Sequence, residues 1–198
     1  MMQVRLSATD LACRRGERLL FAGLTLDLTP GMALHLAGPN GVGKSSLIRI
    51  LAGLARPWSG SVAREGAVAL IDERAALDPD WALGRALAFW AGLDGADLAA
   101  PIERLGLAPL LEVPVRYLST GQRKRAALAQ LLGQQAPILL LDEPLNGLDA
   151  SAVALVETLT GEHCAAGGIA LIASHQSFTL AGMARLELGD YAPRQVLQ

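Results

Sequence analysis

The chain has 198 residues and a mass of 20.7 kDa, enough for one domain with a buried core, or for such a domain carrying one inserted lobe. Apolar residues make up 52% and charged residues 18% of the sequence, so the composition excludes an intrinsically disordered chain. The net charge of −2 and the pI near 5.9 provide no basic field for a polyanion, and we expect no nucleic-acid partner.

The first third of the chain predicts strands followed by a glycine loop and a helix. Residues 1–5 begin an alternating pattern instead of a secretory signal, so we expect a protein that stays in the cytoplasm. The alternation of apolar and polar residues continues through residues 3–36 and is broken by a Thr-Pro-Gly turn. An apolar run at residues 33–37 stops at Gly38, and residues 45–54 carry leucine and isoleucine at helical spacing.

The rest of the chain predicts a helical insertion and then alternating helices and strands. Short helices are expected around residues 83–93 and 98–107, with no clear strand among residues 77–118. After this lobe we expect helices at about 119–132 and 150–164, each followed by a purely apolar strand, at 138–141 and 169–173. Such alternation is typical of a parallel sheet covered by helices.

The apolar runs argue against a membrane-spanning segment, and the cysteine spacing argues against a CxxC metal or redox site. The mean hydropathy of +0.34 is high, but the longest apolar runs are far shorter than the roughly 20 residues that span a bilayer. Cys13 and Cys164 lie too far apart in sequence for a CxxC metal or redox motif, and we expect both to be small buried residues.

Residues 38–45, GPNGVGKS, match the phosphate-loop pattern GxxxxGKS between a predicted strand and a predicted helix. The glycines allow backbone N–H groups to surround a phosphate, Lys44 reaches the β and γ oxygens, and the Ser45 hydroxyl binds Mg²⁺. The alternative is a glycine-rich turn without a ligand. The predicted nucleotide-binding residues here are Gly38, Pro39, Asn40, Gly41, Val42, Gly43, Lys44, Ser45 and Ser46.

Residues 138–143, ILLLDE, describe a buried strand that delivers two carboxylates at its carboxyl end, where parallel sheets bind ligands. Asp142 is placed to join the Mg²⁺ shell together with Ser45, and Glu143 to polarise the water that attacks the γ-phosphate. By itself, a strand followed by an acidic turn occurs in many folds. Together with the phosphate loop, it predicts an ATP-hydrolysing site.

The segment LSTGQ at residues 118–122 opens a helix whose first turn is basic. One interpretation is an ordinary capping box, in which Ser119 and Gln122 satisfy each other's backbone N–H groups. The other is an anion site, because a helix N-terminus with a serine hydroxyl and a glycine backbone binds phosphate. The two interpretations do not exclude each other.

These motifs resemble those of the ATP-binding cassette family of ATPases, and the resemblance extends over essentially the whole chain. LSTGQ is similar to the family's LSGGQ signature, with Thr120 at its first glycine. The resemblance implies a head-to-tail pair of subunits in which Ser119, Gly121 and Gln122 of one copy contact the ATP of the other. It also implies that Asp149 lies along the seam between the copies and that His175 senses the γ-phosphate. The alternative for His175 is a structural role, as is common for a histidine after an apolar strand. We assign a structural role to His35, inside a predicted strand, and to His163, near the end of a predicted helix.

The sequence departs from the family pattern at two positions. The aromatic residue that stacks on adenine has no Tyr or Phe counterpart, and Arg15 stands in its place. A guanidinium plane stacks on a base, so we expect Arg15 to bind the nucleotide, with a solvated surface charge as the alternative. The glutamine that touches Mg²⁺ at the start of the lobe is also missing, and Glu73 occupies the matching stretch.

The resemblance implies an α/β fold: a P-loop NTPase (RecA-like) core with an N-terminal antiparallel β subdomain and an inserted helical subdomain. We expect one ATP-binding domain over residues 1–198. Its parts would be residues 1–71 with the β subdomain and phosphate loop, 72–134 with the helical lobe and signature, and 135–198 with the rest of the core.

Within the family, the segments at 15–24, 46–54, 57–60 and 88–91 resemble the ATP-binding subunits of the cytochrome c maturation system. This implies an ATPase with ATP and Mg²⁺ as cofactors that energises haem export, or release of a haem-carrying chaperone. It also implies an integral membrane transporter subunit as partner and a peripheral location at the cytoplasmic face of the bacterial inner membrane. The alternatives are an ATPase subunit of another small transporter and a soluble regulatory ATPase.

The predicted lobe is rich in large apolar residues, which suggests a surface for the membrane subunit. The alternative is that these residues pack the lobe onto the core. They are Leu77, Trp81, Leu83, Leu87, Phe89, Trp90 and Leu93.

Overall fold

The computed structural model describes residues 4–72 and 76–193. The elements are β1 (Arg5–Arg15), β2 (Arg18–Leu28), β3 (Ala33–Ala37), α1 (Lys44–Leu51), β4 (Ser59–Glu65), β5 (Val68–Ile71), α2 (Leu83–Asp94), α3 (Ala99–Arg104), α4 (Thr120–Gly133), β6 (Ile138–Asp142), α5 (Ala150–Ala165), β7 (Ile169–Ala173) and β8 (Ala184–Glu187). Among the described helices, none has both the length and the apolar character that crossing a bilayer requires.

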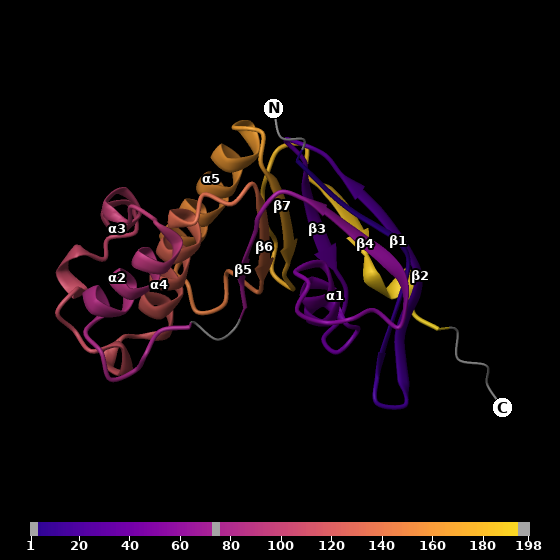
Figure 1. Ribbon diagram of the computed structural model, residues 1–198, viewed down its shortest axis with the longest axis horizontal. Coiled ribbons are helices and arrows are strands. Elements are labelled where there is room, and N and C mark those ends of the chain that lie inside the picture. The colour runs from indigo at the N-terminus through magenta and orange to yellow at the C-terminus, as the bar shows by residue number, and fades with distance from the viewer. Residues whose placement is uncertain (1–3, 73–75, 194–198) are drawn as a thin grey trace.

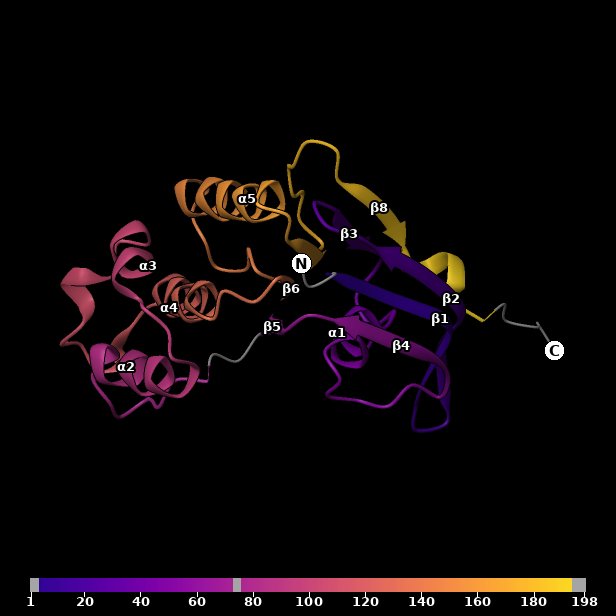
Figure 2. The ribbon, with the colours of Figure 1, turned by 45° about the horizontal axis from the view of Figure 1, so that its top comes forward.

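The strands form two separate sheets, which confirms the expected α/β fold. One sheet is antiparallel, in the order β2-β1-β4, and lies to the right in Figure 1. The other is parallel, in the order β5-β6-β7-β3-β8. The helices α2, α3 and α4 lie together on the side of the parallel sheet that faces away from the antiparallel sheet, as Figures 1 and 2 show.

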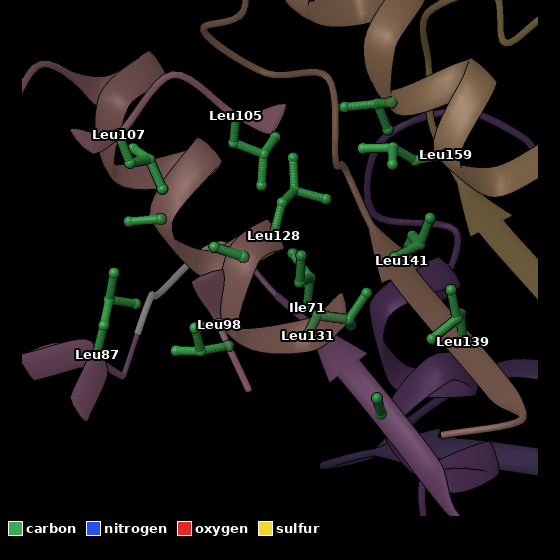
Figure 3. Packing of buried hydrophobic residues seen from close by; sticks show 14 of the residues in the cluster. Ile71, Leu87, Leu98, Leu105, Leu107, Leu128, Leu131, Leu139, Leu141 and Leu159 are labelled. Atoms are coloured by element: carbon green, nitrogen blue, oxygen red, sulfur yellow. The ribbon is translucent and has the colours of Figure 1, made fainter. Parts of the chain in front are cut away.

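Both faces of the parallel sheet are buried, because its strands are apolar at consecutive positions. In β6, Ile138 and Leu140 belong to the core between the two sheets, where α1 contacts β1, β6 and β7. The alternate residues Leu139 and Leu141 belong to the second core, under α4 and α5. Figure 3 shows Leu128 of α4 in that second core, between the leucines of the sheet and those of the lobe. The sheet is therefore the central layer that fixes both the phosphate-loop helix and the lobe.

Two predicted helices end earlier in the structure than expected, and strand β4 was not expected. Helix α1 ends at Leu51 instead of reaching residue 54, since Gly53 has a left-handed φ of 81° and Leu54 is exposed. Helix α3 ends at Arg104, two residues before Gly106, whose φ is 63°. Strand β4 was not expected, because its sequence SGSVARE lacks the apolar alternation of a strand with one buried face. Its backbone pairs with β1 while its side chains stay largely exposed.

The apolar residues of the lobe divide between core and surface. Leu77, Leu83 and Leu87 are buried, whereas Phe89 and Leu93 are 48% and 64% exposed. Trp81 and Trp90 are half-buried and pack edge-on against Phe89, at centroid distances of 5.7 and 5.4 Å. Those residues therefore include core positions and an exposed aromatic edge.

Both cysteines are buried and free, as expected. Burial raises the pKa of the Cys13 thiol, against the opposing effect of a hydrogen bond with Ser46. Burial likewise raises the pKa of the Cys164 thiol. Neither thiol is activated as a nucleophile, because activation requires a lowered pKa.

Candidate active site

The carboxyl ends of β3, β6 and β7 meet at one level of the parallel sheet. Ala173 of β7 is paired with Leu36 of β3 on one side and with Asp142 of β6 on the other. The segments that begin at Gly38, Glu143 and Ser174 therefore leave the sheet side by side. Segments that are more than 100 residues apart in sequence become neighbours here.

The phosphate loop between β3 and α1 requires glycine at particular positions. Gly38, Gly41 and Gly43 have φ values of 139°, 78° and 117°, which side chains rarely adopt. A Cβ atom on Gly43 would also lie only 3.2 Å from the Phe21 ring. The Lys44 ammonium is buried, and its Nζ donates to the carbonyls of Gly38 at 2.8 Å and Pro39 at 3.4 Å. The lysine thus spans the loop from one end to the other.

A polar cavity of about 490 Å³ lies over this loop. It is lined by residues of the β1–β2 hairpin, the phosphate loop and the ends of β6 and β7: Arg15, Arg18, Leu20, Asn40, Gly41, Gly43, Lys44, Ser45, Ser46, Glu143, Asn146 and His175. The structure thus brings together Arg15, most of the loop and both proposed hydrolytic residues. Ser119, Gly121, Gln122 and Asp149 are not among the lining residues.

Glu143 and His175 form a hydrogen-bonded pair in this cavity. His175 Nδ1 lies 2.8 Å from Glu143 Oε2, and the His175 backbone N–H donates to the same oxygen at 3.4 Å. An ionised carboxylate only accepts hydrogen bonds, so Nδ1 carries the proton in this arrangement. The ring is thereby oriented with Nε2 on its other side, and the histidine side chain is 49% exposed.

The backbone at Glu143 is held in an uncommon conformation. Its φ is 49°, and its N–H donates to the Ala173 carbonyl at 2.8 Å. A left-handed conformation at a non-glycine residue costs free energy and is concentrated at functional sites. This cost supports the prediction that Glu143 has a chemical role.

The residues present fit Mg²⁺ bound together with a nucleotide. Asp142 is buried at the end of β6, and Ser45 lines the cavity. Among residues 4–72 and 76–193, no group of three or more His, Cys, Asp or Glu side chains could hold a metal ion. Mg²⁺ usually takes one or two carboxylates, water and substrate phosphates instead of an all-protein cage, so this donor set suits it.

The start of α4 has the capping box that the sequence predicted. Ser119 Oγ accepts from the Gln122 N–H at 3.2 Å, and Gln122 Oε1 accepts from the Ser119 N–H at 2.8 Å. Asp149 in turn caps α5 by accepting from the Ala152 N–H at 2.8 Å. The Ser151 hydroxyl and that N–H hold the pKa of Asp149 below its ordinary value.

The other predicted positions are accounted for as follows. His35 is buried in β3 with Nε2 3.0 Å from the Ser174 carbonyl, and His163 Nε2 faces the carbonyls of Pro137 and Ile169 at 3.2 and 3.3 Å. Both histidines have structural surroundings, as expected. Glu73 lies outside the described residues.

The sequence analysis missed three residues of the cavity: Arg18, Leu20 and Asn146. Arg18 pairs directly with Arg15 across the hairpin, whose turn is Gly16-Glu17. Residues opposite each other in an antiparallel pair share one face, so a hairpin prediction at this turn would have found Arg18. Asn146 begins the segment at residues 146–149, which resembles the family's motif along the seam between copies, but it was not assigned to the nucleotide site.

Comparisons with known proteins agree with this geometry. The family model described as ABC transporter matches residues 21–146. The chain is 54% identical over 193 residues to the cytochrome c biogenesis ATP-binding export protein CcmA of Novosphingobium aromaticivorans, covering 98% of this chain and all of the relative. It is 47% identical to the protein of the same name from Zymomonas mobilis, covering 94% of this chain and 86% of the relative.

Solved structures show the same fold. An ABC transporter ATP-binding protein from Pyrococcus furiosus superposes with a TM-score of 0.82 at 22% identity, covering 96% of this chain and all of that chain. An inward-facing metal-chelate type ABC transporter gives a TM-score of 0.79 at 22% identity, covering 94% of this chain and 80% of that chain. With sequence motifs, fold and full-length relatives in agreement, this chain belongs to the ABC transporter family of ATPases, and within it to the group of the CcmA proteins.

Proposed function

We propose that the chain is the ATP-hydrolysing subunit of a membrane ABC transporter for c-type cytochrome biogenesis, acting in haem export or in release of a haem-carrying chaperone. The observation that carries the hydrolytic part is the cavity in which Lys44, Glu143 and His175 converge. The cytochrome part rests on the similarity to relatives named for that process, over nearly the whole chain.

Different residues of the cavity bind the phosphates of ATP and activate the attacking water. The backbone N–H groups of the phosphate loop and the Lys44 ammonium hold the β- and γ-phosphates of ATP. The Glu143 carboxylate polarises the attacking water, and His175 holds that carboxylate through its Nδ1–H. The Mg²⁺ that Ser45 and Asp142 would hold neutralises phosphate charge when bound.

The proposal includes two protein partners. A second copy of the chain binds head-to-tail, so that Ser119, Gly121 and Gln122 of one copy reach the γ-phosphate in the other, with Asp149 along the seam. An integral membrane subunit docks on the helical lobe, where Phe89 and Leu93 are exposed. The chain is then peripheral, at the cytoplasmic face of the bacterial inner membrane.

Replacement of Lys44 tests this function. Lys44→Ala should abolish ATP hydrolysis without unfolding, since it removes a charge-assisted contact to phosphate where transition-state charge gathers. Arg5→Ala removes an exposed cation at the opposite end of β1 from Arg15 and serves as the control. In a bacterium that lacks its own subunit, the wild type and the control should restore c-type cytochromes, and Lys44→Ala should not. Normal turnover in Lys44→Ala would refute the site. An active ATPase that restores no cytochromes would indicate another transporter.

A further inference from the structure

The signature segment and the loop after β6 touch each other within one chain. A Cβ atom on Gly147 would lie 2.8 Å from Thr120 Cγ2 and 3.3 Å from Thr120 Cβ. A Cβ atom on Gly121 would lie 2.7 Å from the Gly147 carbonyl oxygen. Distances this short leave no room for another methyl group. The first turn of α4 is therefore packed directly onto the backbone of that loop.

The loop that Thr120 contacts begins at Glu143. At its start, the Glu143 N–H is bonded to the Ala173 carbonyl at 2.8 Å. At its end, the Asp149 carboxylate caps α5. Between these fixed ends, Gly147 has a φ of 79°, and a Thr120 methyl group covers the face where a side chain would stand. The first turn of α4 is thereby in contact with a short loop whose first residue is the proposed hydrolytic carboxylate.

We propose that Thr120 is a positioning residue: its Cγ2 methyl, packed on Gly147, keeps the first turn of α4 and the Glu143 loop moving as one unit. The inference rests on the proposed function, because it assumes hydrolysis at Glu143. In the head-to-tail pair, the signature of a chain and its Glu143 serve different ATP molecules, so this contact would join the two sites through one chain. In this proposal the Thr120 methyl group makes the contact with Gly147 that supports turnover, and the Thr120 hydroxyl is not required for turnover.

Two substitutions of Thr120 separate these parts. Thr120→Ser keeps the hydroxyl and removes the methyl, and Thr120→Val keeps the methyl and removes the hydroxyl. We expect Thr120→Ser to lower kcat for ATP at an unchanged KM, by at most about fourfold, because Thr120 is an exposed residue and only a fully buried methyl group would be worth that factor. Thr120→Val should retain the wild-type kcat. The reverse order, with Ser active and Val impaired, would overturn the proposal in favour of a polar contact to phosphate.

A double-mutant cycle tests the contact itself. Gly147→Ala should lower kcat strongly, because its methyl would collide with Thr120 and because alanine is strained at a φ of 79°. The double variant Thr120→Ser/Gly147→Ala should be more active than Gly147→Ala alone, since the collision is relieved while the strain remains. Strictly additive effects would overturn the proposal.

Two controls keep the outcomes distinct. Thermal unfolding midpoints of every variant identify losses of activity that come from loss of folding. Lys44→Ala, measured alongside, tests the function on which the proposal depends. Turnover that survives Lys44→Ala contradicts the proposed function. Lys44-dependent turnover with additive effects at Thr120 and Gly147 contradicts only the role of Thr120.

Discussion

Replacing Glu143 with glutamine separates the binding of ATP from its hydrolysis. The side chain is nearly buried, and one oxygen receives both the Nδ1–H and the backbone N–H of His175. Glutamine has the same shape, and its amide oxygen accepts both hydrogen bonds. The substitution therefore keeps the site in place and removes only the basicity of the carboxylate.

The expected size of the effect follows from that loss of basicity. A positioned general base contributes roughly 10²–10⁴ to a rate, so kcat should fall by about a hundredfold or more. A hundredfold loss corresponds to about 2.7 kcal/mol of activation free energy. The affinity for ATP should not change, because the phosphate loop and Lys44 supply the binding contacts.

The assay combines steady-state turnover, ATP titration and sizing. With ATP and Mg²⁺, Glu143→Gln should accumulate as a dimer, because the nucleotide that closes the pair is not hydrolysed. Glu112→Gln makes the same change at an exposed carboxylate of the lobe and should behave as wild type. A kcat within about threefold of wild type would refute the role of Glu143. A variant that binds ATP normally and stays monomeric would count against the head-to-tail pair.

Two further predictions concern the edge of the cavity and the lobe. Arg15→Ala should weaken ATP and GTP binding alike, by about 0.5–2 kcal/mol, because a guanidinium stacks on the ring face of either base. With Arg5→Ala as control, an unchanged Kd for nucleotide would leave Arg15 as a surface charge. Replacing Phe89 and Leu93 together by serine should abolish co-purification of the membrane subunit and preserve basal ATPase activity, since both are exposed. Leu83→Ala, at a buried position, should instead lower the free energy of unfolding by about 2–5 kcal/mol. If the double serine variant of Phe89 and Leu93 lost both its fold and its ATPase activity, these two residues would belong to the core and not to a docking surface.

Sequence alone predicted the features that depend on neighbours along the chain. The phosphate loop is one, because the positive φ values at Gly38, Gly41 and Gly43 belong to positions that the motif reserves for glycine. The capping box at Ser119 is another, because its partners lie three residues apart. The buried strand at residues 138–141 is a third, because apolar side chains at consecutive positions indicate burial on both faces.

Other features have no local signal and were decided by packing. Strand β4 exists because its backbone pairs with β1, although its side chains are polar. The boundary of α1 depends on Gly53, which the helical spacing of leucines did not reveal. The contact of Thr120 with Gly147 joins two separate segments.

Sequence thus predicted which residues carry the chemistry, since each motif is set by short-range backbone geometry and by the hydropathy of consecutive residues. Only the tertiary structure decided how they meet. Glu143 and His175 are 32 residues apart, and their bond exists because β6 and β7 are paired in a register that ends both strands at one level. Such a register is fixed by hydrogen bonds and buried surface between distant strands, which no local pattern in the chain records.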